Sequence, residues 1–139
     1  MFGRILAAND GSVRAFKALS AACDFAKRFN AELHMIVVEE LPRFPASVDE
    51  ITEEIKEADH QLEAMVSRAN TLVGMQNLKL HAHVVPGHPV PTIVEFIRER
   101  GFDLLVIGFM GHSAIYERII GGTADRLVRL APCTVVVVK

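Results

Sequence analysis

With 139 residues, 50% of them hydrophobic and 23% charged, the chain is long enough for one compact domain that needs no disulfide or metal for stability. Its 15 basic and 17 acidic side chains give a formal net charge of −2 without a basic run, so we do not expect nucleic acid to bind a cationic surface. No apolar run approaches the roughly 20 residues of a membrane span, and the start lacks a signal-peptide pattern, so we expect a cytoplasmic protein without a membrane partner.

Apolar segments typical of strands alternate with amphipathic helical segments along the chain. In chain order, we predict a strand at 4–9, a helix from Ser12 to Asn30, a strand at 33–38, a long helix at 48–74, a strand at 78–85, a helix after Pro89, a strand at 103–107, a helix at 124–130 and a strand at 134–138. Strands joined through helices predict a parallel sheet with right-handed crossovers and helices on both faces. The runs at 104–107 and 135–138 are apolar on both sides, as in strands covered on both faces. We therefore expect one α/β domain over 1–139, a doubly wound, Rossmann-like five-stranded parallel sheet with strand order 3-2-1-4-5.

The two cysteines lie far apart in the sequence. Cys23 is in an apolar helical pattern, and Cys133 comes just before the last strand. We expect both to be buried free thiols in a reducing compartment and not a redox pair.

The most specific feature of the sequence is a group of glycines that follows the strand at 103–107. Gly108 and Gly111 are followed by nine residues and then by Gly121, Gly122 and Thr123, where a helix begins. Glycine leaves no Cβ in the way of a ligand, and a helix amino terminus offers unpaired N–H groups and a partial positive charge. Such a loop is suited to bind phosphate. The alternative is that these are only turn glycines.

Ligands of doubly wound sheets bind at the carboxyl ends of the strands, where the strand order reverses. In the expected order, the first strand leads to Asp10 and the fourth leads to Gly108, and these two ends are neighbours at that point. The Asp10 carboxylate can accept hydrogen bonds from a ribose or a base edge while the glycine loop holds phosphates. Asp10 could instead only cap the first helix.

Three segments of the chain resemble the universal stress protein family, and the resemblance extends over the whole length. They are residues 5–12 (Ile-Leu-Ala-Ala-Asn-Asp-Gly-Ser), residues 87–89 (Gly-His-Pro) and the stretch 103–138 that holds the glycine motif. The nucleotide-binding branch of that family carries Gly, two residues, Gly, nine residues, Gly and then Ser or Thr. Gly108, Gly111 and Gly121 match this spacing. The resemblance implies the same sheet, dimerisation, and binding of an adenine nucleotide, ATP first, with or without Mg²⁺.

The resemblance also implies roles for individual residues. Asp10 would bind the adenosine end of the nucleotide, and backbone groups near Val37 would bind the adenine edge. Ile107 and Gly108 would lie beneath the ribose and phosphates. The residues expected to bind phosphate oxygens, mainly through backbone N–H groups, are Gly111, Gly121, Gly122 and Thr123. His112 could either touch phosphate or stay solvated.

The chain departs from the family pattern after the third motif glycine. Gly122 stands where a hydroxyl residue is expected, and the hydroxyl comes one position later, on Thr123. Loss of a hydrogen bond to a charged group typically costs ~1.5–3 kcal/mol, or roughly ten- to a hundredfold in affinity. Unless Thr123 compensates, we expect the pocket to prefer a di- or monophosphate or to hold ATP weakly.

The sequence carries no pattern of a nucleotide-hydrolysing or nucleophilic enzyme, such as a Walker-type lysine or a Gly-x-Ser-x-Gly turn. We therefore predict no catalytic residues and at most slow ATP hydrolysis. His81 and His83 lie two apart on a predicted strand, a spacing that metal ligands can use. No third ligand is evident nearby, and an exposed face of an edge strand explains both, so we predict no metal site.

Two functions stay open. The first is a cytoplasmic stress-response regulator that signals through adenine-nucleotide occupancy to an unidentified protein partner. Its last strand, Thr134–Val138, is an apolar sheet edge that would pair with a second copy to form a homodimer. The second is a nucleotide-free dimeric module that acts through protein–protein contacts, with the glycines as architecture only.

Overall fold

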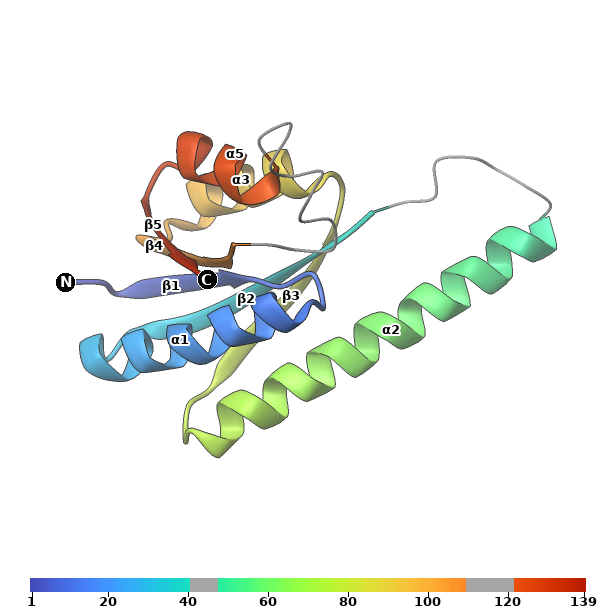
Figure 1. Ribbon diagram of the computed structural model, residues 1–139. Helices are drawn as coiled ribbons and strands as arrows, with labels where there is room; N and C mark the ends of the chain where they lie inside the picture. Colours follow the sequence, from blue (N-terminus) through green and yellow to red (C-terminus); the bar gives the residue numbers. More distant parts are fainter. Residues whose placement is uncertain (41–47, 110–121) are drawn as a thin grey trace.

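Five parallel strands form a sheet whose two faces are covered by helices (Figure 1). The computed structural model describes residues 1–40, 48–109 and 122–139. The strands are paired in the order β3-β2-β1-β4-β5. Their bounds are β1 (Arg4–Ala8), β2 (Glu32–Glu39), β3 (Leu80–Pro86), β4 (Leu104–Gly108) and β5 (Thr134–Val138), and the helices described are α1 (Val13–Phe29), α2 (Val48–Met75), α3 (Pro89–Arg100) and α5 (Thr123–Leu130). The predicted fold class and strand order are confirmed.

The two faces of the sheet carry separate apolar cores. Side chains alternate between the faces along a strand, so Ile5 and Ala7 of β1 pack beneath α1 and α2, whereas Leu6 packs toward α3 and α5. Leu105 and Ile107 of β4 join the second core, also fully or nearly fully buried. Because both faces are covered, the buried positions of β1 and β4 are apolar, and β4 reads as a continuous hydrophobic run.

The last strand is less buried than its sequence predicts. Residues 104–107 of β4 are at most 3% exposed, as expected for a strand covered on both faces. Val135, Val136, Val137 and Val138 of β5 are only half-buried. The physical reason is position: β5 lies at the edge of the sheet, with β4 on one side only. The expectation of full coverage was therefore right for β4 and wrong for β5.

The first helix begins and ends where local sequence predicts. The Ser12 side chain accepts a hydrogen bond from the backbone N–H of Ala15 at 3.1 Å, which identifies it as the N-cap. Asn30 ends the helix in the left-handed conformation, with φ of 50°. Lys27 and Arg28 in the last turn complement the negative end of the helix dipole.

The bounds of β1 to β4 differ from the predicted ones by one or two residues, and two of the differences have a clear local cause. β3 begins at Leu80 and not at Leu78, because Leu78 donates its backbone N–H to the Val73 carbonyl and so belongs to the turn that ends α2. Asn77, with φ of 59°, makes that turn. β1 ends at Ala8 and does not include Asn9, whose side chain accepts a hydrogen bond from the Gly11 N–H in the turn that follows.

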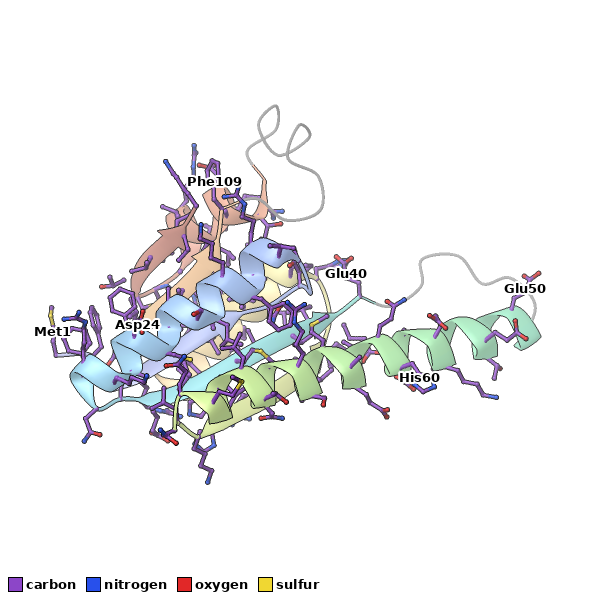
Figure 2. The ribbon with its side chains drawn as sticks, turned by 60° about the horizontal axis from the view of Figure 1, so that its bottom comes forward. Met1, Asp24, Glu40, Glu50, His60 and Phe109 are labelled. Atoms are coloured by element: carbon purple, nitrogen blue, oxygen red, sulfur yellow. The ribbon has the colours of Figure 1, made fainter. Side chains whose placement is uncertain are left out.

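Helix α2 extends well past the sheet, and Figure 2 shows its first turns, with Glu50, far from the strands. Acidic side chains on this helix face solvent where they are described, at Glu50, Glu53, Glu57 and Asp59. Asp49 and Glu54 lie outside the described side chains. None of the helices described is both long and apolar enough to cross a membrane.

The two cysteines are both free thiols, but they differ in exposure. Cys23 is fully buried in α1, and burial is the main cause that raises its pKa. Cys133 is only partly buried. The expectation of burial is thus confirmed for Cys23 and wrong for Cys133, which precedes the half-covered edge strand β5.

Candidate functional site

A pocket opens at the carboxyl ends of β1, β2 and β4, where the strand order reverses between β1 and β4. Its walls also include the starts of α1, α3 and α5. The residues that line it are Ala8, Asn9, Asp10, Ser12, Ala15, Ile36, Val38, Pro89, Ile93, Ile107, Gly108, Phe109, Thr123, Ala124 and Leu127. An apolar cleft with a few converging polar groups is the usual form of a small-molecule site.

The polar groups of one wall come from the turn between β1 and α1. Asn9 is 4% exposed, and its Oδ1 accepts a hydrogen bond from the Gly11 N–H at 2.8 Å. Asp10 is exposed at the pocket, and its Oδ1 accepts a hydrogen bond from the Ser12 N–H at 3.0 Å. Asp10 therefore orders the turn, whereas Ser12 is the N-cap of α1. The Asp10 side chain also lines the pocket.

Gly108 lies at the end of β4, at the bottom of the pocket, and is packed tightly against α1. A Cβ added to it would come within 2.8 Å of the Arg14 carbonyl carbon and 2.9 Å of the Arg14 oxygen. Gly11 opposite has φ of +86°, which strongly favours glycine. Both glycines thus have reasons in the fold itself, in addition to any approach of a ligand.

The other wall is the amino terminus of α5. Gly122 is its N-cap and provides no side-chain hydrogen bond to the first turn. Thr123 and Ala124, the first helical residues, line the pocket. The first N–H groups of a helix have no partner inside the helix and carry a partial positive charge. This wall is therefore suited to an anion.

A second positive charge lies beside the same pocket. The Lys139 ammonium is 5.3 Å from the centre of the Phe109 ring, and that ring forms part of the pocket lining. The Phe109 N–H donates to the Val138 carbonyl at 2.9 Å, which ties the end of β4 to the end of β5.

The structure brings four of the predicted site residues to this pocket: Asp10, Ile107, Gly108 and Thr123. Gly122, the N-cap of α5, directly precedes Thr123 but is not itself part of the lining. Gly111, His112 and Gly121 lie outside the described residues. Val37 has its side chain in the opposite core, 2% exposed, and only its backbone passes between Ile36 and Val38, whose side chains line the pocket. The alternation of side chains along β2 is the sequence signal that identifies Ile36 and Val38 as the pocket-facing residues.

The whole chain matches one protein family. A model of the universal stress protein family matches residues 1–139. The chain belongs to the universal stress protein family.

Individual family members agree with this membership. Universal stress protein MJ0531 of Methanocaldococcus jannaschii is 30% identical over 144 residues, which cover 100% of this chain and 83% of that protein. Among solved structures, universal stress protein UspA from Lactobacillus plantarum superposes with a TM-score of 0.84 at 27% identity, over 99% of this chain and 98% of that chain. A universal stress protein in complex with cAMP superposes with a TM-score of 0.80 at 23% identity, over 99% and 97% of the two chains.

A second group of polar side chains in this universal stress protein lies on the α3 side of β2 and β3, toward the amino ends of these strands. His34 stacks on His81 with ring centres 4.5 Å apart, and its Nδ1 is 2.9 Å from Nε2 of His83. His34 is 5% exposed, and His81 and His83 are partly buried. The expected exposed face is therefore wrong, and so is the expected lack of a third ligand, because the register of β2 and β3 places His34 opposite His81.

The environment of this group keeps His34 uncharged at neutral pH. Burial, followed by the neighbouring His81, His83 and Arg4, lowers the pKa of His34 from 6.5 to about 4. Burial is also the main cause that lowers the pKa of His83. Neutral imidazole is the form that donates a lone pair to a metal or accepts a hydrogen bond.

Proposed function

We propose that this universal stress protein binds an adenine nucleotide, with ATP as the first candidate, in the pocket at the ends of β1, β2 and β4. The observation that carries the proposal is that one pocket combines an apolar cleft with the uncapped amino terminus of α5 at the reversal of strand order. Bound nucleotide then acts as a signal, not as a substrate in metabolism.

The two ends of the pocket suit the two ends of a nucleotide. The side chains of Ile36, Val38 and Ile93 provide an apolar surface for a base. The Asp10 carboxylate, at the pocket mouth, can accept hydrogen bonds from ribose hydroxyls. Phosphates would then extend to the first turn of α5, where Thr123 offers both a hydroxyl and a backbone N–H.

The absence of a side-chain hydroxyl at Gly122 affects the phosphate end only. A phosphate there would be held by backbone N–H groups and Thr123, with the Lys139 charge beside the Phe109 wall. This arrangement supports an adenine nucleotide more strongly than it supports three phosphates in particular. The structure with the same fold that is described as a complex with cAMP supports the same class of ligand.

Bound nucleotide would change the surface near the pocket and the homodimer interface, and a partner protein would respond to this change. β5 is an apolar edge strand directly beside β4, and the Phe109–Val138 hydrogen bond links the pocket to that edge. Pairing of two β5 strands would cover the half-exposed valines. Nucleotide can shift such a protein between states only if it binds one state better than the other.

The second candidate is a nucleotide-free dimeric module, and two observations favour it. Gly108 is required by the packing of Arg14, and Asp10 is used to order the turn before α1. Both features would therefore persist in a protein that binds no nucleotide.

Calorimetric titration of nucleotide-stripped protein with ATP, with and without Mg²⁺, distinguishes the two candidates. We expect saturable binding in the micromolar range, weakened in Asp10→Ala. The matched control is Asp24→Ala, an exposed carboxylate on α1 away from the pocket (Figure 2), which should bind as the parent does. No heat up to millimolar ATP, AMP or cAMP from protein with an intact fold favours the nucleotide-free module.

A further inference from the structure

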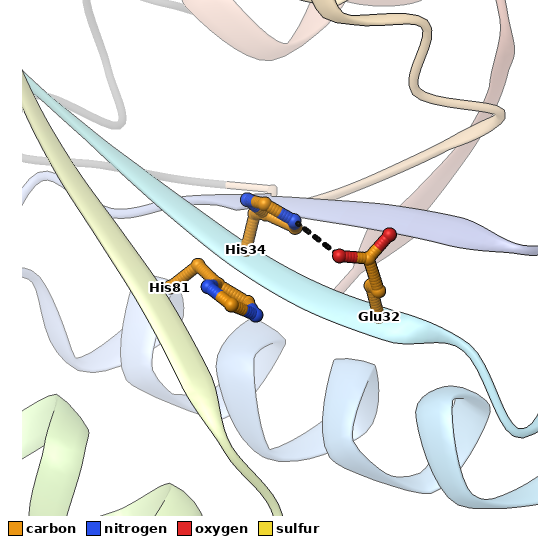
Figure 3. A group of neighbouring side chains, drawn as sticks. All are labelled: Glu32, His34 and His81. Carbon is orange, nitrogen blue, oxygen red and sulfur yellow. Dashed lines mark ion pairs between the residues drawn. The ribbon is translucent and has the colours of Figure 1, made fainter.

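We propose that Glu32, His34 and His81 (Figure 3) form a binding site for one divalent transition-metal ion of the zinc type, at the amino ends of β2 and β3. None of the three residues lines the nucleotide pocket. The three side chains offer two imidazoles and one carboxylate, and their ligand atoms all lie within 4.8 Å of one another. This donor set is one that Zn²⁺ and similar ions prefer.

The sheet itself brings these ligands to one face. Glu32 and His34 are two residues apart on β2 and therefore point to the same side. His81 lies directly opposite His34 in the parallel register of β2 and β3. Three ligands on two hydrogen-bonded strands need no loop to place them.

The strongest sign of a ligand is the unsatisfied nitrogen of His34. Its Nε2 atom is buried, has no hydrogen-bond partner, and faces Glu32 Oε1 at 3.6 Å, too far for a hydrogen bond. A buried polar atom without a partner is costly and calls for an explanation. Two ligand atoms of a tetrahedral zinc, each about 2.0–2.1 Å from the ion, lie about 3.3 Å apart. An ion would therefore fit between these two atoms with little movement.

Neighbouring groups favour the forms of His34 and Glu32 that can bind a metal ion. When the Nδ1–H of His34 donates to His83 Nε2, a neutral His34 carries its lone pair on Nε2. Metal-binding histidines usually donate their second ring N–H in this way. The other carboxylate oxygen of Glu32 lies 3.4 Å from Arg4 Nε, so Oε1 remains available to an ion.

The remaining ligand completes the site by a small movement. The His81 ring is stacked on His34 at a centroid distance of 4.5 Å and must tilt for its nitrogen to point at the shared ion. His81 is partly exposed and Glu32 is exposed, so a side-chain rotation is open to His81 and the ion has a route from solvent. Three protein ligands leave a fourth position for water. The ion would tie the edge strand β3 to β2.

The test uses the full chain without a histidine tag, stripped with a chelator and kept free of nucleotide. Titration with ZnCl₂ by calorimetry should give one ion per chain and a rise in Tm. Co²⁺ in its place should show the visible absorption of tetrahedral coordination. His81→Ala and Glu32→Gln, both at sites exposed enough to tolerate substitution, should each weaken binding at least tenfold, by analogy with the ~10–100-fold loss on removing outer-shell partners.

His60→Ala is the matched control, because His60 is exposed on α2. It should bind as the parent does. Failure of the parent to bind, equal affinity in the two ligand variants, or equal loss in the His60 variant would each overturn the site. Because no nucleotide is present, these outcomes are independent of the proposed nucleotide function.

Discussion

The Nδ1 atom of His34 lies 2.9 Å from the Nε2 atom of His83, so a hydrogen bond joins imidazoles of two neighbouring strands beneath α3. His34 is buried and His83 is partly buried, and both have a lowered pKa, that of His34 about 4. Protonation of either ring would place a charge in this shielded position. The charged and titratable groups around the pair are Arg4, Glu32, His81 and Arg100.

From this pair we predict that the metal-free protein loses stability as the pH falls from about 6.5 to about 4. In this window the unfolded chain protonates His34, whereas the native state keeps it neutral, so the free energy of unfolding decreases with decreasing pH. The complete shift corresponds to on the order of 3 kcal/mol. Urea unfolding of chelator-treated protein at a series of pH values measures the effect.

The comparison that isolates His34 uses two histidine variants. His34→Gln should flatten the pH dependence in this window, even if it lowers stability at every pH. His60→Gln, changed at an exposed position of α2, should retain the slope of the parent. An unchanged slope in His34→Gln would contradict the assignment.

A second prediction concerns the close packing of Gly108. Gly108→Ala should lower the free energy of unfolding by about 1–3 kcal/mol, the usual cost of overpacking, because the new methyl group meets the Arg14 backbone. Gly74→Ala is the matched control: nothing lies within 4 Å of a Cβ there, and the position is helical. It should be neutral or stabilise by up to about 1 kcal/mol. Equal effects at the two positions in denaturant titrations would show that the contact with Arg14 is unimportant.

The sequence predicts a feature well when the interacting residues are close together along the chain, and poorly when they are far apart. The alternation of apolar and amphipathic segments predicted the elements and their order. A strand that is buried on both faces, such as β4, is apolar at consecutive positions, and this pattern is visible in the sequence. Caps at Ser12 and Asn30 were predictable because they act within one turn. The pairing of His34 with His81 was not, because it depends on the register between β2 and β3, which no local pattern records.

The same distinction applies to the pocket. Asp10 and Gly108 were placed correctly at the reversal of strand order because strand order alone determines which ends meet. The close contact between Gly108 and Arg14 depends on how α1 packs onto β4, so the sequence alone does not indicate the packing role of this glycine. On β2, the resemblance implies that backbone groups near Val37 bind the adenine edge, and the side chains of its neighbours Ile36 and Val38 line the pocket.

The third prediction addresses the amino terminus of α5. Gly122 has φ of −54°, which any residue can adopt, and Gly122→Ser would add a side-chain cap to the helix. We expect a gain of a few tenths of a kcal/mol in stability without ligand. If phosphate binds at this helix end, ATP affinity should also rise roughly tenfold or more, by one hydrogen bond to a charged group. Thermal unfolding and calorimetry separate the two effects, and a stability gain with no change in affinity would place the phosphates elsewhere.

The fourth prediction separates the two thiols. Cys133 is partly exposed and should react with a thiol reagent in the native protein, slowly because desolvation, the main cause, raises its pKa. Cys23 is 0% exposed and should react only after unfolding. Mass spectrometry of labelled peptides identifies the site. Cys133→Ser should abolish native-state labelling and Cys23→Ala should not; early labelling of Cys23 would mean that α1 opens readily.

The last prediction concerns the proposed homodimer. If two β5 strands pair, light scattering at micromolar concentration should give the mass of a dimer, and Val136→Lys should give a monomer, because a charge on an edge strand opposes pairing. Val84→Lys places the same charge on β3, the opposite edge, at a valine that is 44% exposed. It should remain dimeric. Circular dichroism verifies that both variants are folded. A monomeric parent would exclude the dimer. Dissociation by Val84→Lys alone would assign the interface to β3 instead.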